Sequence, residues 1–297
     1  MAEIHSFNHR AMATRFEVRI ADEERTYAAQ AAQAVLELLD ELESRLSRFR
    51  AHSDVAQIAE LVPGDTMRLS ESAFACLEIA KKMEAATRRA FSATAAALET
   101  QAAAPEWSLL PEELSIRCES GRLQFDLGAI GKGFALDRMA VLLREWDCPA
   151  FLLVAGGSSI LAGAGPGDAP GWSCGLGGDN ATQRVFLAHE SLSGSGLAVK
   201  GNHILDPRTG RLAQRQNRAW ALTDIAAESD ALSTACMVLS EAELNEVLAE
   251  HLSWLVFLES DGVAQPKGSR ALPPAAGIHL CDITDPKTVN RPRNTSG

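Results

Sequence analysis

The sequence predicts an α+β fold in which antiparallel sheets are flanked by helices. Residues 14–20 alternate apolar and polar side chains, which is the period of a half-buried strand. Residues 26–49 repeat apolar side chains every three or four positions, which is the period of a helix with one buried face. From residue 149 onward, short apolar segments alternate with Gly- and Pro-rich turns, which is typical of further strands.

The positions of the other elements follow from turn and cap residues. Ser70 suits a helix N-cap, and a Pro-Gly turn stands just before it. Alternating apolar residues on both sides of residues 119–121 predict a hairpin whose second strand runs into Asp126. The remaining expected elements are a helix that starts just after Lys132, a buried strand that turns at Gly156–Gly157, and short strands at 172–177 and 184–189.

Composition limits the function classes. The 297 residues are 46% hydrophobic, which is enough for the core of one large domain or two packed subdomains. A net charge of −11 without a dense Lys/Arg run argues against nucleic acid as a partner. Neither a secretory signal nor a membrane span is expected from the apolar segments. Six scattered cysteines predict reduced, buried thiols and a cytoplasmic location, and we expect one domain over 1–284 with a polar tail at 285–297.

The first motif with chemical content covers residues 126–138. Gly128, Gly131 and Gly133 allow backbone N–H groups to approach an anion at a helix N-terminus. The spacing matches neither a Walker A loop nor a dinucleotide fingerprint. Two interpretations stay open, namely an anion site that includes Asp126 and Lys132, or a Gly-rich structural turn with a solvated lysine.

A second motif places a base, a carboxylate and a cation in one short loop. His203, Asp206, Arg208 and Thr209 lie together around a Pro-Gly turn. An imidazole next to a carboxylate suits proton transfer near neutral pH. The alternative is a tight turn between two strands, for which Asp-Pro-Arg-Thr-Gly is an ordinary sequence.

A third motif predicts oxygen ligands on one face of a helix. Asp230, Ser233 and Thr234 are separated by three and four positions, so their side chains share a face near the helix start. Hard oxygen ligands with a single carboxylate suit Mg²⁺, which completes its shell with water and substrate phosphate. The alternative is ordinary capping of the helix, with Thr234 bonding back to a backbone carbonyl.

Taken in order, the motifs resemble those of the ApbE-type FAD:protein FMN transferases, a family of flavin transferases. The similarity spans about residues 10–240. The matching segments are Met12–Thr14, Ser47–Phe49, Ala90–Thr94, Asp126–Asp137, Ala155–Gly157, His203–Gly210 and Ser229–Thr234. The chain departs from the family pattern where Ala13 replaces a glycine, and where Arg89 and Ser92 replace the glycine and aspartate of Gly-x-Phe-Asp.

The resemblance implies an activity and a site. The activity is Mg²⁺-dependent transfer of FMN from FAD to a Ser or Thr hydroxyl of a target flavoprotein, with release of AMP. The fold it implies resembles a T-fold, with a cleft between two subdomains. By similarity, Mg²⁺ is held by Asp230, Ser233, Thr234 and the carbonyl of Ala129. The residues implied to contact FAD are Met12, Phe49, Ala90, Phe91, Ser92, Asp126, Lys132 and Ile204.

His203 is the candidate base for the incoming hydroxyl, because an unperturbed imidazole titrates near neutral pH. Asp206 is expected either to orient it or to take the role itself. Two other functions stay open. One is a Mg²⁺-dependent FAD pyrophosphatase in which water replaces the protein hydroxyl. The other is a non-catalytic flavin-binding module, which the departures at Arg89 and Ser92 favour.

Overall fold

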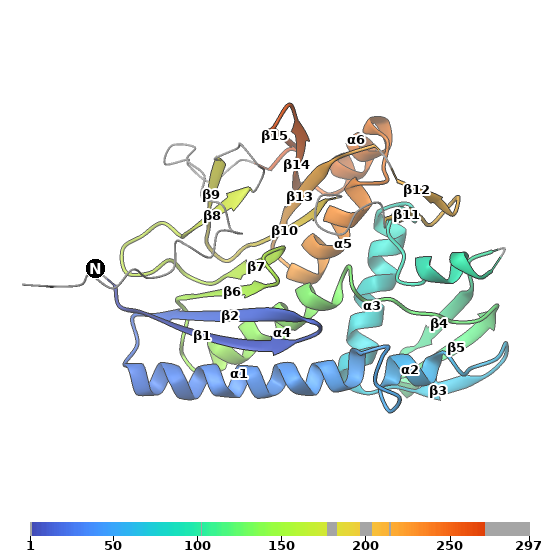
Figure 1. The fold of residues 1–297 in the computed structure, drawn as a ribbon, viewed down its shortest axis with the longest axis horizontal. Helices are drawn as coiled ribbons and strands as arrows, with labels where there is room; N and C mark the ends of the chain where they lie inside the picture. The colour runs from blue at the N-terminus through green and yellow to red at the C-terminus, as the bar shows by residue number, and fades with distance from the viewer. Residues whose placement is uncertain (1, 102, 177–182, 197–203, 214, 271–297) are drawn as a thin grey trace, which may run out of the picture.

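An antiparallel sheet of eight strands forms the centre of the computed structural model, which describes residues 2–101, 103–176, 183–196, 204–213 and 215–270 (Figure 1). Its order is β1-β2-β6-β7-β10-β13-β14-β15. The strands are β1 Ile4–Ala11, β2 Thr14–Ala21, β6 Phe151–Ala155, β7 Ser159–Ala162, β10 Ser191–Gly196, β13 Arg218–Thr223, β14 Leu255–Ser260 and β15 Val263–Lys267. The predicted α+β class with antiparallel sheets is therefore confirmed.

Alternation along the sheet creates two apolar cores, one on each face. On β2, the predicted inward residues Phe16, Val18 and Ile20 are all fully buried in the larger core. The neighbouring positions of β6 point both ways, so Leu153 joins the larger core and Leu152 the smaller one. The smaller core is covered by a two-stranded sheet of β8 (Trp172–Leu176) and β9 (Gln183–Leu187). Both the Gly156–Gly157 turn and these short strands are confirmed.

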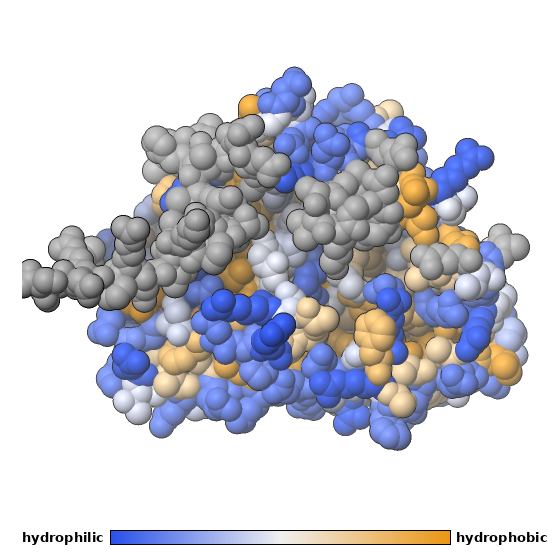
Figure 2. Space-filling view, in the orientation of Figure 1, coloured by the Kyte–Doolittle hydropathy of each residue, from blue (hydrophilic) through white to orange (hydrophobic). Residues whose placement is uncertain are grey.

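Helices cover the larger core. α1 runs beside β1 and β2, with mainly hydrophilic residues on its outward side (Figures 1 and 2). Residues of the main sheet's larger core pack against buried side chains of α1, α4 and α5. The helices are α1 Arg25–Leu46, α2 Asp54–Ile58, α3 Glu71–Ala86, α4 Gly131–Glu145, α5 Ala226–Cys236 and α6 Glu241–Glu250. Within the described ranges, no helix is both long enough and apolar enough to cross a membrane.

The first helix ends earlier than its periodicity predicted. α1 stops at Leu46, because Ser47 turns to an extended conformation after its N–H bonds to the Glu43 carbonyl. Phe49 therefore does not lie on the buried face of the helix, as the spacing had suggested, but is 81% exposed. Residues 4–11, to which no predicted element was assigned, form the edge strand β1 beside β2.

A small sheet lies beside α3 and corrects the predicted hairpin. Its order is β3-β5-β4, with strands β3 Thr66–Arg68, β5 Ser115–Ser120 and β4 Glu106–Leu110. The turn of the hairpin lies at the 3-10 helix η2, Pro111–Glu113, followed by Leu114 in the left-handed region, and not at residues 119–121. Phe125 belongs to a loop and is buried edge-on against Trp107, so burial in a loop imitated the alternation of a strand.

The other described elements are short. They are the 3-10 helix η1 Ala95–Glu99 and the hairpin of β11 (Leu205–Asp206) and β12 (Arg211–Leu212). Five cysteines are buried and unpaired, as predicted; Cys281 and the expected tail at 285–297 lie outside the described residues.

The contact between α4 and α5 requires a glycine. A Cβ atom added at Gly133 would lie 2.1 Å from the carbonyl oxygen of Ala226, which is far closer than real Cβ contacts. Gly133 therefore lets the N-terminal turns of the two helices touch. Since Lys132 precedes this glycine and Asp230 lies one turn into α5, the same contact brings these two side chains together.

We expect Gly133→Ala to lower the free energy of unfolding by about 1–3 kcal/mol, the usual cost of overpacking, or more if the backbone of Ala226 cannot shift. Urea unfolding measures this difference. The matched control is Gly131→Ala in the same helical turn, where an added Cβ meets only the Leu127 Cβ at an ordinary 3.5 Å. Equal stabilities of the two variants would contradict the proposed contact.

Candidate active site

The buried carboxylate of Asp230 is the centre of the candidate site. It is 3% exposed, and both of its oxygens lie 3.1 Å from Nζ of Lys132. Its Oδ2 also accepts the N–H of Gly133 at 3.2 Å, and its Oδ1 accepts the hydroxyl of Ser159 at 3.0 Å. One cation and two neutral donors therefore compensate a charge that is withdrawn from water.

The helix that carries Asp230 is held at its N-terminus by Asp137 of α4. The two carboxylate oxygens of Asp137 accept the N–H groups of Ala226 and Ala227 at 2.7 and 2.8 Å. Burial raises the pKa of Asp137 to about 6, although these two N–H bonds act in the opposite direction. A carboxylate here accepts hydrogen bonds from two of the N–H groups that would otherwise be unpaired at the start of α5. Its negative charge also interacts favourably with the positive end of the α5 helix dipole.

Hydroxyl groups fill the space between α5 and β10. The hydroxyl of Ser195 lies 2.9 Å from that of Ser233 and 3.1 Å from that of Thr234. Ser233 also donates to the carbonyl of Asp230 at 2.9 Å. Deeper in the protein, Ser229 bonds to Ser191 and Ser193 of the same strand. Because β10 presents every second residue to α5, these serines form a polar seam that leads to the site.

The oxygen atoms near Asp230 fit a divalent cation. The carboxylate of Asp230 and the hydroxyls of Ser233 and Thr234 are hard oxygen donors of the kind that Mg²⁺ prefers. The fourth ligand that the resemblance implies, the carbonyl of Ala129, belongs to the turn just before α4. Among the described residues, no group of three or more His, Cys, Asp and Glu side chains is close enough to hold a metal. A metal at Asp230 would therefore depend on neutral oxygens besides the one carboxylate.

A second cluster of interacting groups lies around Asp126, just before α4. Its Oδ1 accepts the N–H of Gly128 at 2.8 Å, and its Oδ2 lies 3.2 Å from Nη1 of Arg48. The Arg48 guanidinium in turn lies 4.8 Å from the ring centre of Phe49. Two of the predicted flavin contacts, Phe49 and Asp126, are therefore neighbours through Arg48, which the sequence did not single out.

The backbone of Gly128 connects the cluster around Asp126 with the ion pair of Lys132 and Asp230. Its N–H bonds to Asp126, and its carbonyl accepts Nζ of Lys132 at 2.9 Å. Lys132 is therefore not a solvated lysine, since it spans from the turn at Gly128 to Asp230, 98 residues further along the chain. Asp126 and Asp230 are thus linked through the backbone of Gly128 and the side chain of Lys132.

The segment at Ala90–Ser92 is close to Asp126 but mostly buried. The side chains of Ala90 and Phe91 lie in the core, whereas the hydroxyl of Ser92 donates to Oε1 of Glu84 at 2.6 Å. The N–H of Asp126 bonds to the carbonyl of Ala93 at 2.8 Å. A ligand at this segment would therefore meet backbone and Ser92 rather than the Phe91 ring.

The first turn of the main sheet lies against a second turn. Met12 and Ala13 form the two-residue turn of β1 and β2, both with positive φ, and the N–H of Met12 bonds to Oε1 of Glu43 at 2.9 Å. Gly156 approaches Thr14 so closely that an added Cβ would lie 2.5 Å from its hydroxyl. Segments 12–14 and 155–157 are therefore brought together.

The structure describes residues 204–210 of the predicted motif that contains His203 and Asp206. His203 lies outside the described residues, and Ile204 is buried with its carbonyl bonded to the N–H of Ala213. Asp206 accepts the N–H, Nε and Nη2 of Arg208, each at 2.9 Å. Burial raises the pKa of Asp206, but the bonds from Arg208 outweigh it and lower that pKa.

The turn at Asp206 is also tied to α6. Nη1 of Arg208 donates to Glu243, whose carboxylate completes a capping box with Ser240. Residues 206–210 are thus a rigid turn between β11 and β12, and the same turn presents an ionised carboxylate. Since β11 lies against η1, this turn is on the side of the molecule that holds the Ala90–Thr94 segment.

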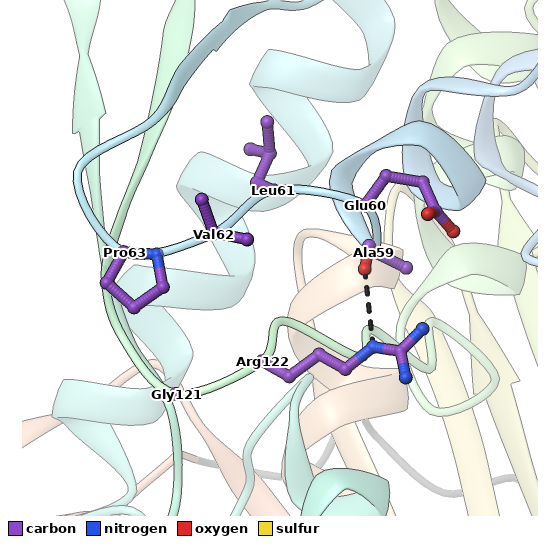
Figure 3. A pocket seen from close by; sticks show the side chains of 7 residues that line it. All are labelled: Ala59, Glu60, Leu61, Val62, Pro63, Gly121 and Arg122. Atoms are coloured by element: carbon purple, nitrogen blue, oxygen red, sulfur yellow. Dashed lines mark hydrogen bonds between the residues drawn. The ribbon is translucent and has the colours of Figure 1, made fainter.

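A separate hollow of about 290 Å³ lies at the far end of the small sheet. It is lined by residues 59–63, Gly121 and Arg122, and Nε of Arg122 donates to the carbonyl of Ala59 at 3.5 Å (Figure 3). It contains none of the predicted site residues and no reactive pair. Lys132 and Asp230 lie instead in the first turns of α4 and α5.

The fold and the site together define an α+β protein whose candidate active site lies where the N-terminal turns of α4 and α5 touch. The site combines the turn at Gly128 with the buried carboxylate of Asp230. A sequence model of the ApbE family matches residues 12–257, and the chain belongs to that family. Curated relatives named FAD:protein FMN transferase are 25% identical over 140 residues in Escherichia coli K12 (42% of this chain, 40% of that protein) and 27% over 157 residues in Treponema pallidum (46% and 43%). The matched segments thus span less than half the length of these relatives.

Solved structures extend the likeness over most of the fold. The flavin transferase ApbE from Vibrio cholerae superposes with a TM-score of 0.75 at 17% identity, covering 91% of this chain and 98% of that chain. The apo form of the Pseudomonas stutzeri flavinyl transferase ApbE gives 0.75 at 20% identity, covering 89% and 94%. These likenesses confirm the predicted α+β, ApbE-like fold.

The raised pKa of Asp137 predicts a pH-dependent stability. Because its folded pKa of about 6 exceeds the ordinary value near 3.9, the folded protein holds the extra proton between these values. The free energy of unfolding relative to Asp137→Asn should fall as pH rises from 4 to 6, by at most about 1.4 kcal/mol per pH unit, and then level off. Urea unfolding of both proteins at several pH values measures it; a difference that is constant with pH would contradict the assignment.

Proposed function

We propose that this chain transfers the FMN half of FAD to a Ser or Thr hydroxyl of a target flavoprotein, with release of AMP, and that Mg²⁺ is required. Family membership and the names of the relatives support this proposal. The observation that carries it is the buried carboxylate of Asp230 beside Lys132, with hydroxyls of the next helical turn alongside. Packing of the two helices does not by itself call for such a pair, since apolar residues of similar volume are often as stabilising as a buried ion pair or more so.

The reaction places specific demands on the site. The hydroxyl oxygen bonds to the phosphorus of the FMN half, the bond to the bridging oxygen of the diphosphate breaks, and AMP leaves with that oxygen. Negative charge that grows on the departing phosphate must be neutralised. A bound Mg²⁺ supplies this neutralisation. In our proposal Asp230, Ser233, Thr234 and the Ala129 carbonyl hold the ion, and Lys132 orients the diphosphate.

The flavin half is assigned to the end of the Gly128 turn that carries Asp126. There the exposed ring of Phe49 and the carboxylate of Asp126 both contact Arg48, and the N–H of Asp126 bonds to the carbonyl of Ala93, which directly follows the Ala90–Ser92 segment. Met12 and Ile204 complete the proposed FAD contacts. We assign the proton of the incoming hydroxyl to His203. The lowered pKa of Asp206 makes it a weak base that is better suited to orienting the imidazole.

The acceptor is proposed to be a flavoprotein that carries an Asp-x-x-Thr-Gly-Ala-Thr segment. Incubation of the protein with FAD, Mg²⁺ and such an acceptor should yield AMP and a covalent FMN adduct, detected by chromatography and mass spectrometry. Asp230→Ala should lower the rate at least about 100-fold, the usual scale for removing one stabilising group from such a site. Asp168→Ala, which removes an exposed carboxylate elsewhere, should leave the rate unchanged.

Two outcomes would contradict the transfer reaction. AMP and free FMN formed without an acceptor would make the protein a pyrophosphatase. Tight FAD binding without any AMP, with or without chelator, would make it a flavin-binding module. Mg²⁺-independent transfer would contradict the metal requirement alone.

Phe49 gives a test of the flavin side. Because its ring is 81% exposed, Phe49→Ala should leave the free energy of unfolding within about 0.5 kcal/mol of the wild-type value. The KM for FAD should rise about 2- to 10-fold, which corresponds to the 0.5–1.5 kcal/mol of an aromatic pair. Leu252→Ala, at a 65% exposed apolar position on another part of the surface, is the control and should leave the KM unchanged. An unaltered KM in Phe49→Ala would remove Phe49 from the site.

A further inference from the structure

The proposed reaction does not explain why the ammonium of Lys132 pairs directly with the carboxylate of Asp230. The side chain of Asp230 is 4% exposed, and that of Lys132 is 20% exposed. The ammonium is equidistant from both carboxylate oxygens, so it faces the whole carboxylate edge rather than one oxygen. Among the described residues, Lys132 is the one cation paired with Asp230. In this state the lysine supplies the charge that burial of the carboxylate demands.

A metal at Asp230 cannot keep this lysine in place. A divalent cation bound to either carboxylate oxygen would lie within a few ångströms of an ammonium 3.1 Å from both oxygens. Like charges at that distance repel strongly where little water screens them. The remaining acceptor capacity of the carboxylate is already partly used by the Gly133 N–H and the Ser159 hydroxyl. The two cations therefore exclude each other from Asp230.

The geometry also shows where the lysine has another partner. Nζ of Lys132 donates to the carbonyl of Gly128, on the turn whose N–H faces Asp126. The four-carbon stem of lysine is flexible and its ammonium has three donors, so it can leave Asp230 while keeping the Gly128 bond. A diphosphate at the start of α4 would supply negative charge in place of the carboxylate.

We propose that Lys132 is a built-in competitor of the divalent cation for Asp230, and that a bound dinucleotide diphosphate removes this competition by drawing the ammonium away. This inference rests on the proposed function, because it assumes a divalent cation at Asp230 and a diphosphate beside it. Its consequence is coupling: each ligand raises the affinity for the other by the same factor, as linkage requires. The metal-free protein thus keeps its buried carboxylate neutralised, and the metal is bound tightly only with substrate.

The first experiment measures Mg²⁺ binding by calorimetry, without an acceptor. In the absence of FAD, Lys132→Met should bind Mg²⁺ at least about tenfold more tightly than the wild type, since the competing cation is gone. Saturating FAD should tighten Mg²⁺ binding by a similar factor in the wild type and by much less in Lys132→Met. The matched control is Arg48→Met, which removes a cation paired with Asp126 rather than Asp230 and should bind Mg²⁺ alone as the wild type does.

A second experiment uses the wild-type protein and does not depend on the folding of a variant. The acetylation rate of Lys132 by acetic anhydride is read by peptide mass spectrometry against Lys82, whose side chain is 69% exposed. Mg²⁺ alone should raise the Lys132 rate several-fold by releasing its ammonium, and FAD added afterwards should lower it again. The rate of Lys82 should stay constant.

The results that overturn the inference are specific. Weaker or equal Mg²⁺ binding by a folded Lys132→Met, no Mg²⁺ binding to any of the proteins, or an acetylation rate that Mg²⁺ does not change would each refute it. Failure of the transfer reaction is a separate result, because neither experiment measures turnover. Competition without AMP formation would refute the proposed reaction, and AMP formation without competition would refute the inference alone.

Discussion

The negative charge of Asp230, withdrawn from water, is the constraint on which the rest of the site depends. A carboxylate at that depth is tolerated only if donors surround it, and its donors come from two elements other than its own helix. Lys132 and Gly133 bring in α4, and Ser159 brings in β7. The close approach of Gly133 to Ala226 and the cap provided by Asp137 exist on the same interface. The packing of α4 on α5 and the electrostatics of the carboxylate are thus one arrangement.

The sequence predicted the elements whose own pattern determines them. The alternation of Phe16, Val18 and Ile20 reflects a sheet with two different faces, and the Gly156–Gly157 turn reflects two positive φ angles. The failures occur where the apolar spacing and the regular structure do not coincide. Phe125 is buried by a loop, and Phe49 continues a helical spacing after the helix has ended. Periodicity records which side chains can be buried, but not which backbone conformation buries them.

The site was predictable in its local parts and not in its assembly. Asp230, Ser233 and Thr234 share a helix face by spacing alone, and the structure brings Ser195 to the last two. That Lys132 pairs with Asp230 could not be inferred from spacing, because 98 residues separate them and the pair depends on a helix contact. The serines of β10 are spaced two residues apart, which indicates that they share one face of a strand. This spacing does not distinguish a functional polar face from an ordinary edge of a strand. Long-range pairing was supplied by the family resemblance rather than by the residues.

The departures at Arg89 and Ser92 look less severe in the structure than in the sequence. Arg88 and Arg89 both have positive φ, a conformation that favours the glycine of the family pattern, and the N–H of Arg89 is held by the carbonyl of Glu84 at 2.7 Å. The carboxylate of the same Glu84 accepts the hydroxyl of Ser92. A negative charge therefore remains at this loop, delivered from α3 instead of from position 92. The backbone shape and the charge that the pattern obtains from two residues of one loop are here both supported by a single residue of the neighbouring helix.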